Sequence, residues 1–203
     1  QFADSPVELV GIATSERFDT PDPAKVKAAI ESSKGYIKLS HDVGSTGVRV
    51  FPNDIQKKVP REVTIKQIAD ALNVVGAFAA DYGQEVRLEA HGSAGDLPTI
   101  RAIMDQVTSP AVRVMLNSNE RDTAGKGFEY NFNLVNGLLG GVIHLHGLSD
   151  PKFPYQLQID LLAKMGWQGW ALLEMSTKVA DRVQALIELR ELWDKMVAKT
   201  TGG

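Results

Sequence analysis

The stretch "VRLEAHG" at residues 86–92 places a glutamate and a histidine two positions apart inside a short apolar run. Successive side chains of a β-strand point to opposite faces. One face of this run is therefore wholly apolar, and the other carries Arg87, Glu89 and His91. The apolar face suits packing beneath helices, whereas the face that ends in a carboxylate and an imidazole predicts a place where chemistry occurs.

Five further short apolar runs occur along the chain: "VELVGIATS" (7–15), "GVRVFPN" (47–53), "VRVMLN" (112–117), "GGVIHLHGL" (140–148) and "GWALLEMS" (169–176). Amphipathic segments separate them, with apolar stripes such as Ile65, Ile68, Ala69, Leu72 and Val75, or Val179, Val183, Leu186, Leu189, Trp193 and Met196. Alternating strands and helices predict a parallel sheet with right-handed crossovers. We expect six βα units in one domain that spans residues 1–203.

The ends of the strands distinguish a barrel from a doubly wound sheet. Polar residues gather on one face toward the C-terminal end of each run: Arg49 and Asn53, Glu89 and His91, Asn117 and Asn119, His144 and His146, and Glu174. Both faces of a doubly wound sheet lie under helices, but the interior of a barrel opens at these strand ends. The pattern therefore favours a (β/α)8 TIM barrel. A buried network of Glu89 with Arg49, Arg87 or Arg113 is the purely structural alternative.

The strand-end residues also suggest a metal site. The carboxylates of Glu89 and Glu174, the imidazole of His144 and the amide oxygen of Asn117 form a mixed ligand set for Mn²⁺, Mg²⁺ or Co²⁺, with Zn²⁺ also open. Such an ion can polarise a carbonyl and stabilise an enediolate, while two glutamates remove and return a proton. From their shared faces we expect substrate contacts from a second set of residues: His91, Asn119, His146, Arg49 and Asn53.

The motifs "VRVFPND", "LEAHG", "LNSN", "IHLHGL" and "GWALLE" resemble the fourth to eighth strands of the xylose-isomerase-like TIM barrels, specifically the sugar phosphate isomerase/epimerase family. The resemblance implies that Glu89, Asn117, His144 and Glu174 hold the metal and that the two glutamates form the acid/base pair. The chain departs from the family pattern at three positions. Asn117 replaces an aspartate, Gly147 replaces an aspartate that orients the histidine, and Glu120 replaces a substrate-binding histidine.

Counting back from Glu174, the first run corresponds to the third strand of that fold. We therefore expect a barrel without its first two strands, with runs 7–15 and 169–176 as open edges that expose Leu9, Ile12 and Leu172. Lost strands would remove substrate contacts, so inactivity of this chain alone is one expected outcome.

The leading hypothesis is a divalent-metal-dependent isomerase or epimerase of a small sugar, sugar phosphate or keto-sugar. A lyase or dehydratase on related sugars and a non-catalytic, sugar-binding barrel stay open. Four histidines and a net charge of −3 argue against an apurinic-site endonuclease or other nucleic-acid partner. No 18-residue apolar run predicts a membrane span, and no cysteine offers a thiolate ligand. We expect a cytoplasmic protein, or an exported one if a signal peptide precedes this sequence, and leave a homo-oligomer open.

Overall fold

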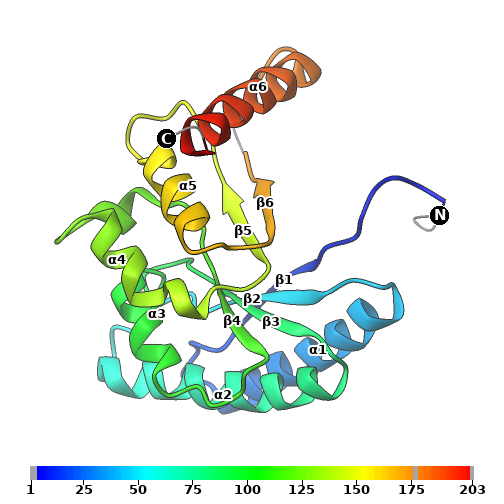
Figure 1. The fold of residues 1–203 in the computed structure, drawn as a ribbon. Coiled ribbons are helices and arrows are strands. Elements are labelled where there is room, and N and C mark those ends of the chain that lie inside the picture. The colour runs from blue at the N-terminus through cyan, green and yellow to red at the C-terminus, as the bar shows by residue number, and fades with distance from the viewer. Residues whose placement is uncertain (1–3, 176–177, 202–203) are drawn as a thin grey trace.

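Six strand–helix units follow one another in a computed structural model that describes residues 4–175 and 178–201 (Figure 1). The units run β1 (Ile12–Arg17), α1 (Pro23–Asp42), β2 (Gly47–Phe51), α2 (Arg61–Asp81), β3 (Glu85–Glu89), α3 (Leu97–Met104), β4 (Val112–Met115), η1 (Glu120–Thr123), α4 (Phe128–Val135), η2 (Asn136–Leu138), β5 (Val142–Leu145), α5 (Tyr155–Lys164), β6 (Trp170–Leu173) and α6 (Arg182–Thr201). The predicted alternation is thus confirmed.

The strands form two parallel sheets that meet at a short seam. Strands β1, β2, β3 and β4 pair in sequence order, and β5 pairs with β6. Between the sheets, Gly140 N donates to Val114 O at 2.9 Å and His144 N donates to Leu116 O at 2.8 Å. The six strands therefore follow one another around a common interior, as in part of a TIM barrel.

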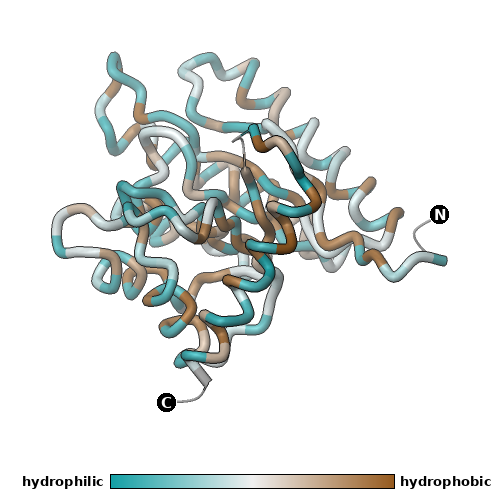
Figure 2. The backbone as a smooth tube through the Cα atoms, turned by 90° about the horizontal axis from the view of Figure 1, so that it is seen from above, coloured by the Kyte–Doolittle hydropathy of each residue, from teal (hydrophilic) through white to brown (hydrophobic). Residues whose placement is uncertain are grey.

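Helices cover the outer side of the strands, with α1 and α2 beneath the four-stranded sheet and α3 at its side, packed against α2 and α4 (Figure 1). The predicted stripe of α2 faces inward, and Ile68, Leu72 and Val75 are fully buried. Seen from above, the hydrophobic segments gather in the middle of the molecule (Figure 2). By length and composition α2 is apolar enough to cross a membrane, although half of its most apolar window is buried inside the protein. A core helix has the same property.

The helix boundaries follow local chemistry. Asp96 accepts a hydrogen bond from Thr99 N at 3.0 Å and caps α3. Gly44, Gly83 and Gly166 follow the ends of α1, α2 and α5. Helix α6 begins at Arg182, so Val179 precedes it, and Val183 and Leu186 on the predicted apolar stripe are exposed.

The first strand lies further along the chain than predicted. Residues 7–11 lie outside β1. In this segment the carbonyl oxygen of Val10 bonds to side chains instead of to the backbone of β2, because it accepts from Thr46 Oγ1 at 2.8 Å and from Arg87 Nη1 at 2.6 Å. The other strands are shorter than the predicted runs. Strand β2 stops before Pro52, which lacks an N–H, and Asn53, which has a positive φ of 58°. Ser176 of the last run lies outside the described residues.

The two outer strands have open edges within the described part of the chain, where β1 pairs only with β2 and β6 only with β5. The expected exposure of Leu9, Ile12 and Leu172 is wrong, because all three are half-buried. Ile12 and Leu172 line a small interior cavity of about 60 Å³ together with Arg49 and His144. The exposed apolar residues at these edges are instead Val7, Trp170 and Leu173.

Candidate metal centre

Three predicted ligands converge at the C-terminal ends of strands from both sheets. Glu89 ends β3, His144 lies in β5 and Glu174 directly follows β6. One ligand atom from each lies within 4.8 Å of the other two. His144 Nδ1 is 3.5 Å from Glu89 Oε2 and 3.4 Å from Glu174 Oε2. These separations are those expected of atoms that share one ion at ordinary ligand distances.

Arg49 reaches the same carboxylates from β2. Its Nη1 lies 3.1 Å from Glu89 Oε2 and 3.8 Å from Glu174 Oε1. The Glu–Arg pair weighed as a structural alternative is therefore present. It involves Arg49 alone of the three inward arginines, since Arg87 pairs with Glu85 at 2.9 Å.

Asn117 is held beside His144 by hydrogen bonds that its two sequence neighbours make with the His144 backbone at the seam between the sheets. Its neighbour Leu116 accepts from His144 N, and the hydroxyl of Ser118 donates to His144 O at 2.8 Å. Asn117 is 4% exposed, and its Oδ1 has no hydrogen-bond partner. His144 Nδ1 is likewise buried without a hydrogen bond. Buried polar atoms rarely stay unpaired, so these two unpaired atoms, on residues that lie side by side at the seam, fit a bound cation.

Burial controls the protonation of the cluster. It raises the pKa of Glu89 to about 7, helped by the Glu174 carboxylate and opposed by the Arg49 guanidinium. Burial also lowers the pKa of His144, against the pull of Glu174. The neutral imidazole that results is the form that binds metals.

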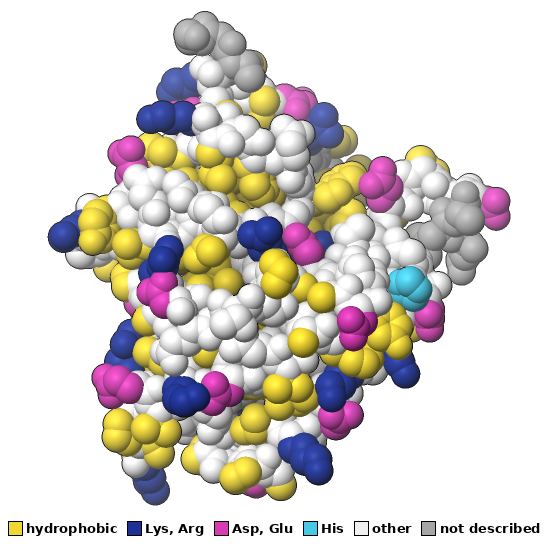
Figure 3. Space-filling model, turned by 60° about the horizontal axis from the view of Figure 1, so that its bottom comes forward, with side chains coloured by type: hydrophobic (Ala, Val, Ile, Leu, Met, Phe, Trp, Pro, Cys, Tyr) yellow, Lys and Arg dark blue, Asp and Glu magenta, His cyan; other side chains and the backbone are white. Residues whose placement is uncertain are grey.

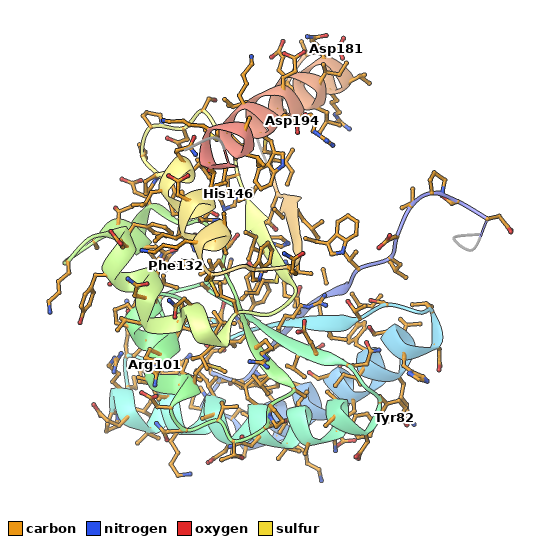
Figure 4. All side chains as sticks on the ribbon, in the orientation of Figure 1. Tyr82, Arg101, Phe132, His146, Asp181 and Asp194 are labelled. Atoms are coloured by element: carbon orange, nitrogen blue, oxygen red, sulfur yellow. The ribbon has the colours of Figure 1, made fainter. Side chains whose placement is uncertain are left out.

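His146 lies beside the cluster, in the part of the molecule formed by β5, β6 and α5 (Figure 4). Its Nδ1 is 2.7 Å from the carbonyl oxygen of Glu174. A carbonyl only accepts, so this nitrogen carries a proton, and Nε2 is the ring nitrogen that this bond does not use. The predicted substrate contact at His146 would therefore be made through Nε2.

His91 and Asn53 lie together on two adjoining loops. The exposed His91 ring lies 4.5 Å from the Phe51 ring, and it is not packed beneath a helix. Asn53 is 9% exposed and donates to Asp54 Oδ2 at 2.9 Å. The loops approach so closely at Gly92, which has a φ of +69°, that a Cβ there would overlap the Asn53 carbonyl. The amide nitrogen of Asn53 is thus already engaged.

Asn119 follows β4 but does not continue the strand. Its Nδ2 donates to Ala90 O at 2.8 Å, so this nitrogen fixes the loop after β3. The next residue, Glu120, takes the position of the family's substrate histidine, and it pairs with Lys152 at 3.5 Å on the surface. Gly147 has no side chain to orient His144, whose backbone is held by Leu116 and Ser118 instead.

Two buried carboxylates near these loops were missed by the sequence analysis. Asp19 follows β1, is 3% exposed, and accepts from Gln56 Nε2 at 2.8 Å. It was overlooked because the first strand was placed too early. Asp122 accepts from Asn119 N at 3.2 Å, and burial raises its pKa to about 7. The Asn-x-x-Asp spacing of this capping box was a usable signal.

Comparison with known proteins agrees with this fold. Residues 1–196 match the family model described as a xylose isomerase-like TIM barrel. No curated protein sequence matches significantly.

Solved structures are similar at low identity. They include a D-tagatose 3-epimerase-like protein (TM-score 0.79, 14% identity, 95% of this chain and 78% of that one). The 3-keto-D-glucoside 4-epimerase YcjR of E. coli gives a TM-score of 0.73 at 14% identity, with coverages of 90% and 78%. The IOLI protein "with a binding zinc atom" gives 0.71 at 16% identity, with 94% and 77%. At such identities the likeness shows the fold, and the match over almost the whole sequence shows that this chain belongs to the xylose isomerase-like TIM barrel family.

Proposed function

We propose that this protein is a divalent-metal-dependent isomerase or epimerase of a small sugar, sugar phosphate or keto-sugar. The observation that carries the proposal is the cluster of Glu89, His144 and Glu174, whose ligand atoms lie within 4.8 Å of one another. Sugar epimerases among the similar structures support the same class.

The proposed ligands are Glu89, Asn117, His144 and Glu174. Their chemistry suits Mn²⁺, Mg²⁺, Co²⁺ or Zn²⁺, and a zinc-containing structural neighbour supports a divalent ion. When bound, the ion would polarise the substrate carbonyl.

Proton transfer is assigned to the two glutamates. One glutamate, as a carboxylate, takes the proton from the carbon next to the carbonyl, and the electrons of the broken C–H bond move toward the carbonyl oxygen. The other glutamate, as a carboxylic acid, donates its proton to form the new bond and is left as a carboxylate. A carboxylate whose pKa is raised to about 7 by burial, as in Glu89, suits a proton carrier near neutral pH.

The substrate would lie against His146, His91, Arg49, Asn119 and Asn53. The contact of His146 is assigned to Nε2, because Nδ1 is already bonded to the carbonyl oxygen of Glu174. The engaged amide nitrogens of Asn53 and Asn119 favour contacts through their oxygens.

The proposed partner is a small sugar. We propose no nucleic-acid or membrane partner and a cytoplasmic location, with a homo-oligomer as an open arrangement. The net charge of −3 supports the first of these. On the face shown in Figure 3, positive and negative side chains are interspersed without a large basic patch.

The test is exchange of solvent deuterium into candidate ketoses by Mn²⁺-supplemented protein. Wild type should exchange the proton next to the carbonyl and form an epimer or isomer. Glu89→Gln and Glu174→Gln should each slow this by about 10²–10⁴-fold, while the exposed Glu191→Gln on α6 serves as the matched control. Loss of water from the sugar would point to the lyase or dehydratase, and sugar binding without exchange to the non-catalytic barrel.

A further inference from the structure

A positively charged side chain lies inside the proposed ligand set. Arg49 Nη1 contacts Glu89 Oε2 at 3.1 Å, and this same oxygen lies 3.5 Å from His144 Nδ1. Among the described residues, no other arginine or lysine lies within 4 Å of Glu89 or Glu174. The guanidinium and an ion held between Glu89 and His144 would therefore use the same oxygen.

Arg49 is held in place from several directions. Its Nη2 donates to Thr14 O at 2.9 Å, and its guanidinium carbon lies 4.5 Å from the centre of the Phe51 ring. The backbone is tied as well, since Thr14 Oγ1 donates to Arg49 O at 2.7 Å. The side chain is only 16% exposed. The contact with Glu89 thus belongs to a fixed network, and the cluster contains its own cation.

The cluster holds charges of both signs. Asn117 is neutral where the family resemblance implies an aspartate, so the acidic ligands are Glu89 and Glu174. The Arg49 guanidinium offsets one of the two glutamate charges. A divalent ion would then enter a cluster of two carboxylates and one fixed guanidinium. Repulsion at this range in a partly buried site is strong enough to govern affinity.

We propose that Arg49 competes with the divalent ion for Glu89 and keeps the metal affinity of this protein low. The inference rests on the proposed function because it assumes that the cluster binds a metal. An ion that takes Glu89 Oε2 displaces one charge-assisted hydrogen bond of Arg49. The guanidinium keeps its bond to Thr14 O and is left free to face the substrate.

The test is calorimetric titration of Mn²⁺ into chelator-treated, substrate-free protein. Arg49→Met removes the charge at similar volume and should bind Mn²⁺ at least about tenfold more tightly than wild type. Arg49→Lys keeps the charge, so its affinity should stay within about threefold of wild type. Arg17→Met is the matched control because Arg17 is an exposed arginine at the end of β1 whose ion pair goes to Asp19. Equal or weaker binding by Arg49→Met would overturn the competition.

A second measurement needs no variant. In a crystal structure of the Mn²⁺-loaded wild type, the contact between Arg49 Nη1 and Glu89 Oε2, now 3.1 Å, should be broken. An ion bound with this contact intact overturns the proposal even if Arg49→Met does not fold. If neither wild type nor variants bind Mn²⁺, Co²⁺ or Zn²⁺, metal dependence itself fails and the competition fails with it. Equal binding by wild type and Arg49→Met rejects the competition alone.

Discussion

The four-stranded sheet and the two-stranded sheet each supply part of one site, yet they are packed very differently. In β3, Val86 and Leu88 are fully buried, whereas in β6 Trp170 is 47% and Leu173 is 39% exposed. The site residues follow the same division, since the side chain of Glu89 is 1% exposed and that of Glu174 is 44% exposed.

Neighbouring elements explain the difference. Strand β3 has a strand on each side and α2 packed against it, while β6 pairs only with β5 in the described chain and α6 packs against α5. The buried sheet can hold Arg49 and Glu89 in fixed positions, and the thinner sheet leaves Glu174 and His146 partly open to solvent. Burial, rather than residue type, therefore distinguishes the two carboxylates.

The largest expected effect is the loss of packing in the buried sheet. Leu88→Ala removes a fully buried side chain and should lower the free energy of unfolding by about 2–5 kcal/mol. Leu173→Ala in β6, at 39% exposure, should cost less than about 1 kcal/mol. Denaturant unfolding measures both. Equal losses would mean that β6 is covered in solution and that the two sheets do not differ as described.

The second prediction concerns pH. The pKa of Glu89 is raised from 4.5 to about 7, so the folded protein holds this proton more tightly than the unfolded chain. The resulting stability is fully present below about pH 4.5 and is lost as pH rises through about 7, with a total on the order of 3 kcal/mol. Metal-free wild type should therefore lose stability across this range relative to Glu89→Gln.

Glu174→Gln is the control for that measurement. It removes the exposed carboxylate and part of the repulsion that raises the pKa of Glu89, so the pH dependence should shrink but persist. Chemical unfolding at pH 4 to 8 gives the comparison. An unchanged slope in Glu89→Gln would show that another group titrates.

The sequence predicted the buried half of the molecule better than the open half. The alternation in "VRLEAHG" and the apolar stripe of α2 predicted burial well, because both faces of β3 have neighbours and each side chain therefore has a defined environment. The same reasoning was only partly right on α6, where Leu189, Trp193 and Met196 pack against the core but Val183 and Leu186 of the same stripe are exposed. A pattern shows which residues could be buried together, not whether a partner covers them.

The candidate site also shows what a sequence pattern can and cannot predict. Strand-end position was enough to suggest that Glu89, His144 and Glu174 meet. The sequence could not show that Arg49 shares an oxygen of Glu89 with His144, because that depends on side-chain direction across three strands. Asp19 was missed for a related reason, since the bonds of Val10 to Thr46 and Arg87 move the start of β1.

A third prediction uses Asn117, at the seam between the two sheets. Asn117→Asp adds a carboxylate where Oδ1 is buried and unpaired. Mn²⁺ affinity should rise by about tenfold, or about 1.4 kcal/mol, because a charged oxygen ligand replaces a neutral one. Titration calorimetry measures this, with the exposed Asn133→Asp on α4 as control. An unchanged affinity would place Asn117 outside the ligand set.

The smallest effect is expected on the open side of the thinner sheet. Leu186 on α6 is 56% exposed and lines a groove of about 570 Å³ with Leu173 and Met175. A side chain that already meets solvent loses little when it becomes polar, so Leu186→Gln should change the free energy of unfolding by no more than about 0.5 kcal/mol. Leu189→Gln, which alters a side chain packed against the core three residues further along α6, should cost more. Unfolding of both variants, with sedimentation of each and of wild type, makes the comparison. A loss above about 1 kcal/mol in Leu186→Gln, together with a smaller sedimenting species, would show that another chain covers this groove and that the contrast between the two sheets holds only for the isolated chain.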